Sequence, residues 1–274
     1  MDKTDKQLLI NISKKMRIDI LRMIHNAGSG HPGPTFSIVE ILAYLFFHQM
    51  RIDPQKPDWS DRDRFVLSKG HGAPALYAAL YERGFFSEKV MLSLRQIGSP
   101  LQGHPIAKMH GVDATTGSLG IGLSQAVGMA LGARMLKSDI KVFAVIGDGE
   151  CDEGQIWEAA LFASHHKLDN LYVFIDNNKD QYEGPVCEVL NLEPLDSKWK
   201  SFGWHVEKID GHDFKAIDNF VVESSSFEFL PHIAVAQTKK GYGVSFMDGN
   251  PDFHARDLNN EEFKQAIKEL QGGK

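Results

Sequence analysis

Hydrophobic residues recur at helical spacing near the start of the chain. From Leu8 to Ile24 every fourth position is apolar, which places these side chains on one face of an α-helix. Glycines at 28 and 30 follow, and glycine commonly stops a helix. The pattern predicts an amphipathic helix that runs into a glycine-rich loop. Further helices are expected at residues 37–50 and 73–83.

Two strand-like runs flank a helix-like segment in the middle of the chain. Residues 141–146 and 171–175 are continuous apolar runs apart from Lys141, and residues 153–166 between them have helical character. A strand, a helix and a strand in this order form a βαβ unit, and such units build parallel sheets. Weaker signals predict strands at 205–209 and 233–236 and helices at 215–223 and 259–270. The expected fold is a single α/β domain over residues 1–274, with a parallel sheet flanked by helices.

Charge and composition argue against nucleic-acid-binding, membrane-spanning and disulfide-rich classes of protein. The chain has 30 basic and 36 acidic residues and a net charge of −6, without a basic block, so neither a nucleic acid nor an anionic membrane is an expected partner. The most apolar stretch, residues 38–47, is far shorter than the ~20 residues of a membrane span. Two cysteines, Cys151 and Cys187, form neither a disulfide framework nor a zinc motif. The expected location is cytoplasmic.

Polar residues follow both strands of the predicted βαβ unit. Gly147-Asp148-Gly149 closes the first strand, and Asp176-Asn177-Asn178 closes the second. Parallel strands present their carboxyl ends to one crevice, so Asp148 and Asn178 should lie close together. A carboxylate, an amide oxygen and a backbone carbonyl suit Mg²⁺, and the glycines allow a phosphate to approach the backbone. The pattern favours a metal-bridged diphosphate site.

Each of these motifs also has a plainer interpretation. Gly, Asp and Asn dominate ordinary turns, so either motif alone indicates a turn more often than a metal site. Three further acids, Glu150, Asp152 and Glu153, stand at the start of the helix, where negative charge opposes the helix dipole. For Glu150 and Asp152 this structural role is the expected one.

Four histidines lie in loops rich in glycine or proline, where an imidazole can reach a ligand: His31, His71, His104 and His254. A single loop histidine is usually just exposed, but four in this setting indicate a site that handles hydroxyls and carbonyls. The adjacent His165 and His166 point about 100° apart on a helix and are expected to be structural. The segment 117–122 resembles a dinucleotide fingerprint, but residues 111–116 before it are loop where a strand is required.

The order of these motifs resembles the N-terminal, diphosphate-binding portion of transketolase, a thiamine diphosphate enzyme. The resemblance runs from about residue 10 to residue 255. It rests on GSGHPG (28–33), the block at 63–78 that contains KGHG, GHP (103–105), TTGSLGIG (115–122), GDGE (147–150), DNN (176–178) and KGYG (240–243) followed by FH (253–254). The implied fold is the thiamine diphosphate-binding fold.

The resemblance also implies roles for individual residues. Asp148 and Asn178 would bind Mg²⁺, or Ca²⁺ or Mn²⁺ in its place, together with the backbone carbonyl of Asp180. The residues expected to contact thiamine diphosphate are His71, Gly149, Asn178 and His254, with Gly117, Ser118 and Leu119 at the aminopyrimidine. His31, His71, His104 and His254 would line the sugar channel as catalytic groups. Glu153, as a cofactor contact, and Glu158, as a catalytic residue, would lie near the partner's catalytic glutamate, or else on a solvated helix surface.

The activity implied is transfer of a two-carbon ketol unit from a ketose phosphate to an aldose, with the protein supplying position, metal and proton transfer. Transketolases also have pyrimidine-binding and C-terminal domains, which are expected here on a second polypeptide, in an α2β2 heterotetramer. Three alternatives stay open: a deoxyxylulose-phosphate synthase-like enzyme, a 2-oxo acid dehydrogenase α-like chain, and a non-catalytic module with the same fold.

Overall fold

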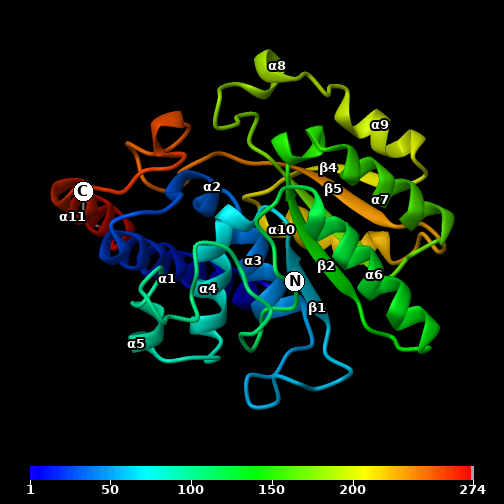
Figure 1. Cartoon of the computed structure of the whole chain (residues 1–274), viewed down its shortest axis with the longest axis horizontal. Coiled ribbons are helices and arrows are strands. Elements are labelled where there is room, and N and C mark those ends of the chain that lie inside the picture. The colour runs from blue at the N-terminus through cyan, green and yellow to red at the C-terminus, as the bar shows by residue number, and fades with distance from the viewer. Residues whose placement is uncertain (273–274) are drawn as a thin grey trace.

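A five-stranded parallel sheet forms the centre of the molecule (Figure 1). The computed structural model describes residues 1–272. The strand order is β1-β2-β3-β5-β4. The strands are β1 (Arg64–Leu67), β2 (Val142–Gly147), β3 (Leu171–Asn177), β4 (His205–Asp210) and β5 (His232–Gln237). Because β2 and β3 are neighbours with Gly147 opposite Asp176, their carboxyl ends lie side by side, as the βαβ unit predicts.

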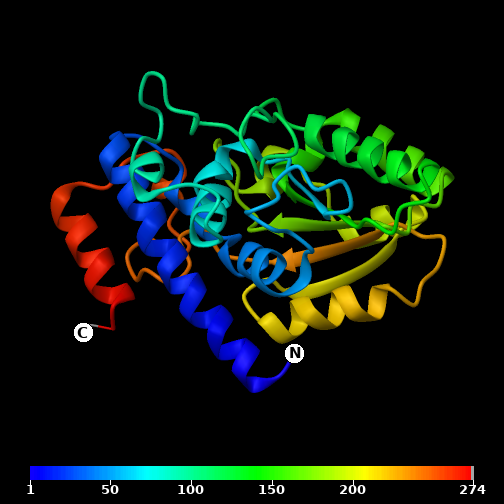
Figure 2. The same ribbon diagram turned by 90° about the horizontal axis from the view of Figure 1, so that it is seen from below.

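Helices cover both faces of this sheet. They are α1 (Lys3–Ala27), α2 (Pro32–Phe36), α3 (Val39–Tyr44), α4 (Ala73–Glu82), α5 (Glu88–Met91), α6 (Ile121–Met135), α7 (Gly154–His165), α8 (Val186–Val189), α9 (Leu195–Ser201), α10 (Phe214–Ser224) and α11 (Asn260–Leu270). Figure 2 shows the sheet between α6 and α7 on one side and α10 on the other. The predicted α/β class, a parallel sheet flanked by helices, is confirmed.

Side-chain alternation along the strands explains the two layers. In β2, Phe143 and Val145 join the core with α1, α3, α4 and α10, whereas Val142, Ala144 and Ile146 join the core with α6 and α7. All six residues of β2 are buried. A strand that packs helices on both faces needs apolar residues at successive positions, and this is why β2 and β3 are continuous hydrophobic runs.

Most predicted elements are present within two or three residues of their expected bounds. The long N-terminal helix ends at Gly28, whose left-handed φ of 63° caps it. The single helix expected at 37–50 is wrong in detail. The chain instead forms α3 and then a π-helical turn, Leu45–Gln49. A separate short helix, α2, precedes it, and Pro32 begins that helix because its φ is preset for a first helical position.

One strand and one long helix have no strong sequence signal. Strand β1 has only four residues, and α6 carries glycines at 122, 128 and 132 that weaken its helical pattern. Packing requires glycine at position 122, since a Cβ there would come within 2.5 Å of the Cα of Ser68. The start of α6 therefore packs directly on the segment after β1. Within residues 1–272, no helix has the length and apolar character needed to cross a bilayer.

A buried acid on α1 should make stability depend on pH. Asp19 is 5% exposed, its Oδ2 has no hydrogen-bond partner, and its Oδ1 lies 3.5 Å from Arg22. Burial, with the nearby charge of Glu82, raises its pKa to about 7. The unfolded chain ionises at about 3.9, so stability contributed by the protonated acid is lost as the pH rises from about 4 to 7.

Asp19→Asn should therefore be more stable than the wild type at pH 8 by about 1–2 kcal/mol, after allowance for screening by solvent. That difference raises Tm by about 2–4 °C per kcal/mol. The pH-dependent part of the gain should have disappeared near pH 4, because the stability contributed by the protonated wild-type acid is lost only as the pH rises above this value. Thermal unfolding at the two pH values is the measurement, with the exposed Asp61→Asn as control. Equal gains at pH 4 and pH 8 would contradict the assignment.

Candidate functional site

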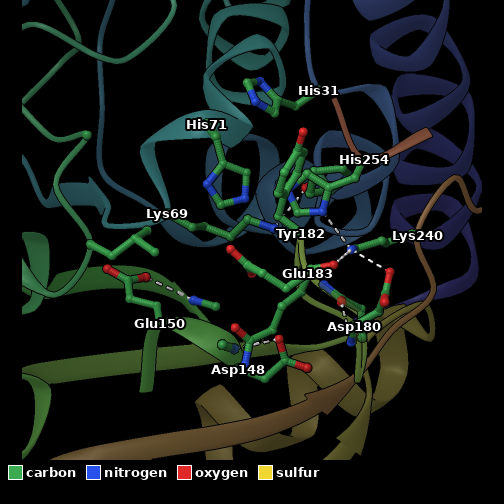
Figure 3. Close-up of a pocket in the computed structure, with 17 residues that line it drawn as sticks. His31, Lys69, His71, Asp148, Glu150, Asp180, Tyr182, Glu183, Lys240 and His254 are labelled. Atoms are coloured by element: carbon green, nitrogen blue, oxygen red, sulfur yellow. Dashed lines mark hydrogen bonds and ion pairs between the residues drawn. The ribbon is translucent and has the colours of Figure 1, made fainter. Parts of the chain in front are cut away.

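A cavity of about 340 Å³ opens at the carboxyl ends of β2 and β3 (Figure 3). Its two ends differ in chemistry. Asp148 lies at one end, and His31 and His71 lie at the other, with Lys69 between them. The lining residues come from the loops after β1, β2, β3 and β5, from the start of α2 and from the segment before α6. The sheet topology thus collects residues that are more than 200 positions apart in sequence.

Asp148 is a buried carboxylate that forms no salt bridge within residues 1–272. It is 4% exposed, and its two oxygens accept only backbone N–H groups, from Gly149 and Lys179. No salt bridge reaches it among the described residues. Burial and then the charge of Asp176 raise its pKa to about 7. Buried charges in proteins are normally paired or bound to a metal, so this carboxylate suits a cation.

The loop after β3 carries Asn178 and Asp180, which line the cavity together with Asp148. The amide nitrogen of Asn178 donates to Asp176 at 3.0 Å, which orients its Oδ1 on the opposite side of the amide. Oδ2 of Asp180 pairs with Nζ of Lys240 at 2.6 Å, and the backbone carbonyl of Asp180 is a further oxygen donor on this loop. Within residues 1–272 no group of three or more His, Cys, Asp or Glu side chains could hold a metal ion. A metal here would therefore use one carboxylate, one amide oxygen and one carbonyl, a donor set that suits a hard cation such as Mg²⁺.

Behind this end lies a buried ion pair that the sequence pattern did not predict. Lys69 pairs with Asp176, and the two side chains are 1% and 0% exposed. Asp176 also accepts from Ser37 and Thr238. Burial raises the pKa of Asp176, but Lys69 and these hydroxyls outweigh burial and lower it. Lys69 also lines the cavity, as does Lys240, so two nearly buried ammonium groups face a ligand bound there. Lys69 stands within the KGHG motif, which is the signal that could have found it.

Three imidazoles form the other end of the cavity. The rings of His31, His71 and His254 lie 5.6–6.1 Å apart, centre to centre. His31 precedes α2, His71 follows β1 in a turn at Gly70–Gly72, and His254 follows a turn at Pro251–Phe253. Burial lowers the pKa of His31 to about 4 and that of His254 to about 3, and it lowers the pKa of His71 well below its ordinary value. All three rings are neutral near pH 7.

Two residues of the loop after β3, Tyr182 and Glu183, also line the cavity, although the sequence pattern does not indicate them. Gln181 N–H donates to the carbonyl of Gly184 at 2.8 Å, and this turn presents Tyr182 and Glu183 to the pocket. The Tyr182 ring meets His254 edge-on at 5.4 Å. Both residues lie next to the predicted ligand Asp180, but nothing in their type or spacing indicates a site.

Some predicted site residues lie outside this cavity. Gly117, Leu119 and Gly149 line it, but Ser118 is exposed and does not. His104 is also exposed, with its ring over Gly117, where a Cβ would be 3.3 Å away. Glu153 and Glu158 are exposed on and just before α7. These four residues are therefore not among those that line the cavity of this chain.

Glu150 lies in the first turn of the short helix Gly149–Asp152, and its role is structural, as expected for an acid at this position. It is 2% exposed, and it accepts from the backbone N–H groups of Gly120 and Gly147 and from the Ser68 hydroxyl. Its carboxylate thus joins three segments that line the cavity. Asp152 accepts from Gln181 at 2.7 Å.

The pocket combines a buried carboxylate beside an amide side chain, two ammonium groups and neutral imidazoles. Residues 6–272 match the family described as "Transketolase, thiamine diphosphate binding domain". The chain belongs to this transketolase family. It is 45% identical to the 6-deoxy-6-sulfo-D-fructose transketolase subunit SqwG of Clostridium sp. (strain MSTE9), over 97% of this chain and 96% of the relative. It is 40% identical to one of the subunits of the apulose-4-phosphate transketolase of Phocaeicola vulgatus, over 94% and 92% of the two chains.

Solved transketolases share the fold. The Leishmania mexicana transketolase superposes with a TM-score of 0.91 at 28% identity, over 96% of this chain and 41% of that chain. The Campylobacter jejuni transketolase superposes with a TM-score of 0.90 at 31% identity, over 100% and 43%. This transketolase-family chain thus spans less than half of each of these two enzymes, but nearly all of the two relatives named as subunits.

Proposed function

We propose that this chain is the thiamine diphosphate-binding subunit of a two-chain transketolase, which transfers a two-carbon ketol unit from a ketose phosphate to an aldose. The observation that carries the proposal is the two-ended cavity, because it offers a cation and diphosphate site next to uncharged hydrogen-bonding groups. Relatives named as transketolase subunits, matched over nearly their whole length, support it.

The acidic end of the cavity is the proposed site for Mg²⁺ and the diphosphate. Asp148 and Asn178 would bind the metal through their side chains and Asp180 through its backbone carbonyl, with Ca²⁺ or Mn²⁺ as substitutes. Gly149 would let the diphosphate approach the backbone, and Gly117, Ser118 and Leu119 would meet the aminopyrimidine. When bound, thiamine diphosphate supplies the nucleophilic carbon for cleavage of the ketose carbon–carbon bond.

The histidine end is the proposed site for the sugar. His31, His71 and His254 are neutral near pH 7, so each can donate one N–H bond to a hydroxyl or carbonyl oxygen without presenting a charge. His104 lies over Gly117 at the edge of the cavity and would contact the ketose from the open side. Hydrogen bonds to several hydroxyls would fix the orientation of the bound ketose. A fixed orientation raises the rate, because the reacting atoms are already aligned.

The rest of the active site is proposed to lie on a second polypeptide. Residues 1–274 would form the diphosphate-binding domain, and the partner would provide the pyrimidine-binding and C-terminal domains in an α2β2 assembly in the cytoplasm. Glu153 and Glu158 are exposed at the start of α7 and are available for such a partner. Relatives named for a sulfonated ketose and for apulose 4-phosphate leave the donor open within the class of ketose phosphates and sulfonates.

Reconstitution tests this proposal. The purified chain with Mg²⁺ and thiamine diphosphate should show no turnover of a ketose and aldose pair, and addition of a polypeptide that carries the pyrimidine-binding and C-terminal domains should restore turnover. The rate should disappear on treatment with a chelator and return with Mg²⁺. Turnover by the chain alone at an ordinary enzyme rate of about 1–10³ s⁻¹ would contradict the two-chain arrangement.

The same assay separates the alternatives. A panel of donors that includes a ketose phosphate, a sulfonated ketose and pyruvate distinguishes a transketolase from a synthase or a 2-oxo acid dehydrogenase, since the last two use a 2-oxo acid. Calorimetry with Mg²⁺, thiamine diphosphate and the second polypeptide tests the non-catalytic module. The absence of any heat of binding would favour the module.

A further inference from the structure

Two side chains that can only donate hydrogen bonds contact two of the pocket histidines at the same ring atom. Nη2 of Arg95 lies 3.4 Å from Nδ1 of His31, and Nζ of Lys240 lies 2.8 Å from Nδ1 of His254. A guanidinium or an ammonium group has no acceptor, so in each pair the imidazole nitrogen must accept. A nitrogen that accepts carries no hydrogen. The single N–H of each neutral ring is then on Nε2.

We infer that Arg95 and Lys240 are positioning residues that hold His31 and His254 as neutral imidazoles with the hydrogen on Nε2. Neither residue is singled out for this role by its sequence pattern. Each acts through the histidine it contacts.

Arg95 is held in place by its backbone and by a close neighbour. Its φ of 60° lies in the left-handed region, and its N–H donates to the carbonyl of Leu101 at 2.8 Å. The guanidinium lies against Gly103, where a Cβ would come within 3.1 Å of Nε. No salt bridge in the described part of the chain involves Arg95, so its charge faces the imidazole without an acid to neutralise it.

Lys240 is held by acceptors on its other side. Its side chain is 3% exposed, and Nζ donates to the carboxylate of Asp180 at 2.6 Å and to the carbonyl of Gln181 at 3.3 Å. Three donor hydrogens thus have three acceptors: the carboxylate, the carbonyl and Nδ1 of His254. Pairing with a carboxylate keeps the amine charged, so it cannot accept from the imidazole.

The surroundings of both rings oppose a second proton. His31 faces Arg95, His71, His104, His254 and Lys69, and burial followed by the charge of Arg95 lowers its pKa to about 4. His254 faces Lys240, Tyr182, the other two imidazoles and Lys69, and burial followed by Lys240 lowers its pKa to about 3. Four acids line the same cavity: Asp148 and Glu150 after β2, and Asp180 and Glu183 on the loop after β3, where Asp180 pairs with Lys240 (Figure 3).

The chemical consequence rests on the proposed function. A ring whose Nδ1 accepts from a cation can offer its pocket-side nitrogen only as a donor, so His31 and His254 would bind the carbonyl and hydroxyl oxygens of a ketose as N–H donors. Neither ring would act as a general base, because accepting a proton at Nε2 would place a second positive charge beside Arg95 or Lys240.

The test is ¹⁵N NMR of the complete chain labelled at histidine, without cofactor. Long-range ¹H–¹⁵N spectra distinguish a ring nitrogen that carries hydrogen from one that does not, and loss of signals in His31→Gln and His254→Gln assigns the two rings. Between pH 6 and 8 both rings should show a bare Nδ1 and a protonated Nε2. A protonated Nδ1 on either ring would overturn the inference for that pair.

Two variants act as matched controls for each other. In Arg95→Met the tautomer of His31 should become mixed and its pKa should rise only in part, since burial, the larger cause of the low value, remains, while His254 keeps its spectrum. In Lys240→Met the tautomer of His254 should become mixed while His31 keeps its spectrum. Thermal unfolding checks that both variants fold. A folded Arg95→Met with an unchanged His31 spectrum contradicts the role of Arg95.

A kinetic measurement tests the consequence separately. In the reconstituted pair, Arg95→Met should raise KM for the ketose about 3–10-fold, the effect of one weakened hydrogen bond, with a smaller change in kcat. An unchanged KM together with the expected NMR spectra would reject the donor role of His31 and leave the tautomer inference intact. Failure of the proposed function would appear as absence of turnover in the wild type, which the NMR experiment does not require.

Discussion

Asp148→Asn should abolish Mg²⁺-dependent binding of thiamine diphosphate and reduce turnover by the reconstituted pair at least about 100-fold, since changing even a residue behind a metal ligand often loses 10–100-fold. Asp148 provides the single carboxylate of the proposed metal site, and it is buried with no salt bridge to it in the described part of the chain. Asparagine keeps the size of the side chain but removes the charge that attracts the metal. Titration calorimetry of the cofactor with and without Mg²⁺ measures the loss directly.

The matched control is Asp152→Asn, which removes a carboxylate from the same turn while keeping an acceptor for Gln181. This variant should bind the cofactor within a few-fold of the wild type. Without metal, Asp148→Asn should unfold at the wild-type temperature or above it, because a buried unpaired carboxylate lowers stability. A folded Asp148→Asn that still binds thiamine diphosphate in a Mg²⁺-dependent way would reject the metal assignment.

Arg17→Met should lower the free energy of unfolding by about 3–5 kcal/mol, because it leaves a buried carboxylate unpaired. Arg17 on α1 contacts Glu40 on α3 through two hydrogen bonds of 2.7 and 2.8 Å, and the two residues are 4% and 5% exposed. His212 also donates to Glu40 at 2.9 Å, and Nε of Arg17 donates to the carbonyl of Tyr242 at 2.8 Å. The network therefore joins two helices to the loops after β4 and β5.

Denaturant unfolding of Arg17→Met and of the double variant Arg17→Met/Glu40→Leu measures this effect. Replacing both charges with apolar groups should recover most of the loss, because a buried ion pair often contributes little beyond the desolvation of its own charges. Burial raises the pKa of Glu40, but Arg17 and His212 hold it at about 2. The stability this carboxylate contributes should therefore persist above about pH 4.5 and fall between pH 4.5 and pH 2. A single variant within about 1 kcal/mol of the wild type would show that the pair is not structurally important.

The predicted elements that proved correct are those whose pattern is set by local packing needs. Strands β2 and β3 are continuous apolar runs because both of their faces are covered, and α1 has a complete apolar stripe. Strand β1 and helix α6 escaped detection for the opposite reason. The first is four residues long, and the glycines of the second include Gly122, which serves a contact with the distant Ser68. Such contacts leave no periodic trace in a single sequence.

The residues of the candidate site also fall into two groups, those that the sequence indicates and those that only the fold reveals. Asp148, Asn178 and the loop histidines stand out because their residue types and their positions after strands have a direct chemical meaning. Lys69, Lys240, Arg95 and Tyr182 do not, because a lysine, an arginine or a tyrosine in a loop is usually solvated. For Glu150 the expected structural role is correct, but only the fold shows that its carboxylate is buried and which segments it joins.

The sequence by itself therefore determined the α/β class, the edge of the sheet at which a ligand would bind and the residue types that would hold a cation and contact a sugar. These properties follow from strand and turn patterns within short windows. Only the tertiary structure decided which charges are buried, which cations contact His31 and His254, and that Lys69 pairs with Asp176. Burial and pairing depend on segments far apart in the chain, and the electrostatic free energy of a group depends on its surroundings in space rather than on its neighbours in sequence.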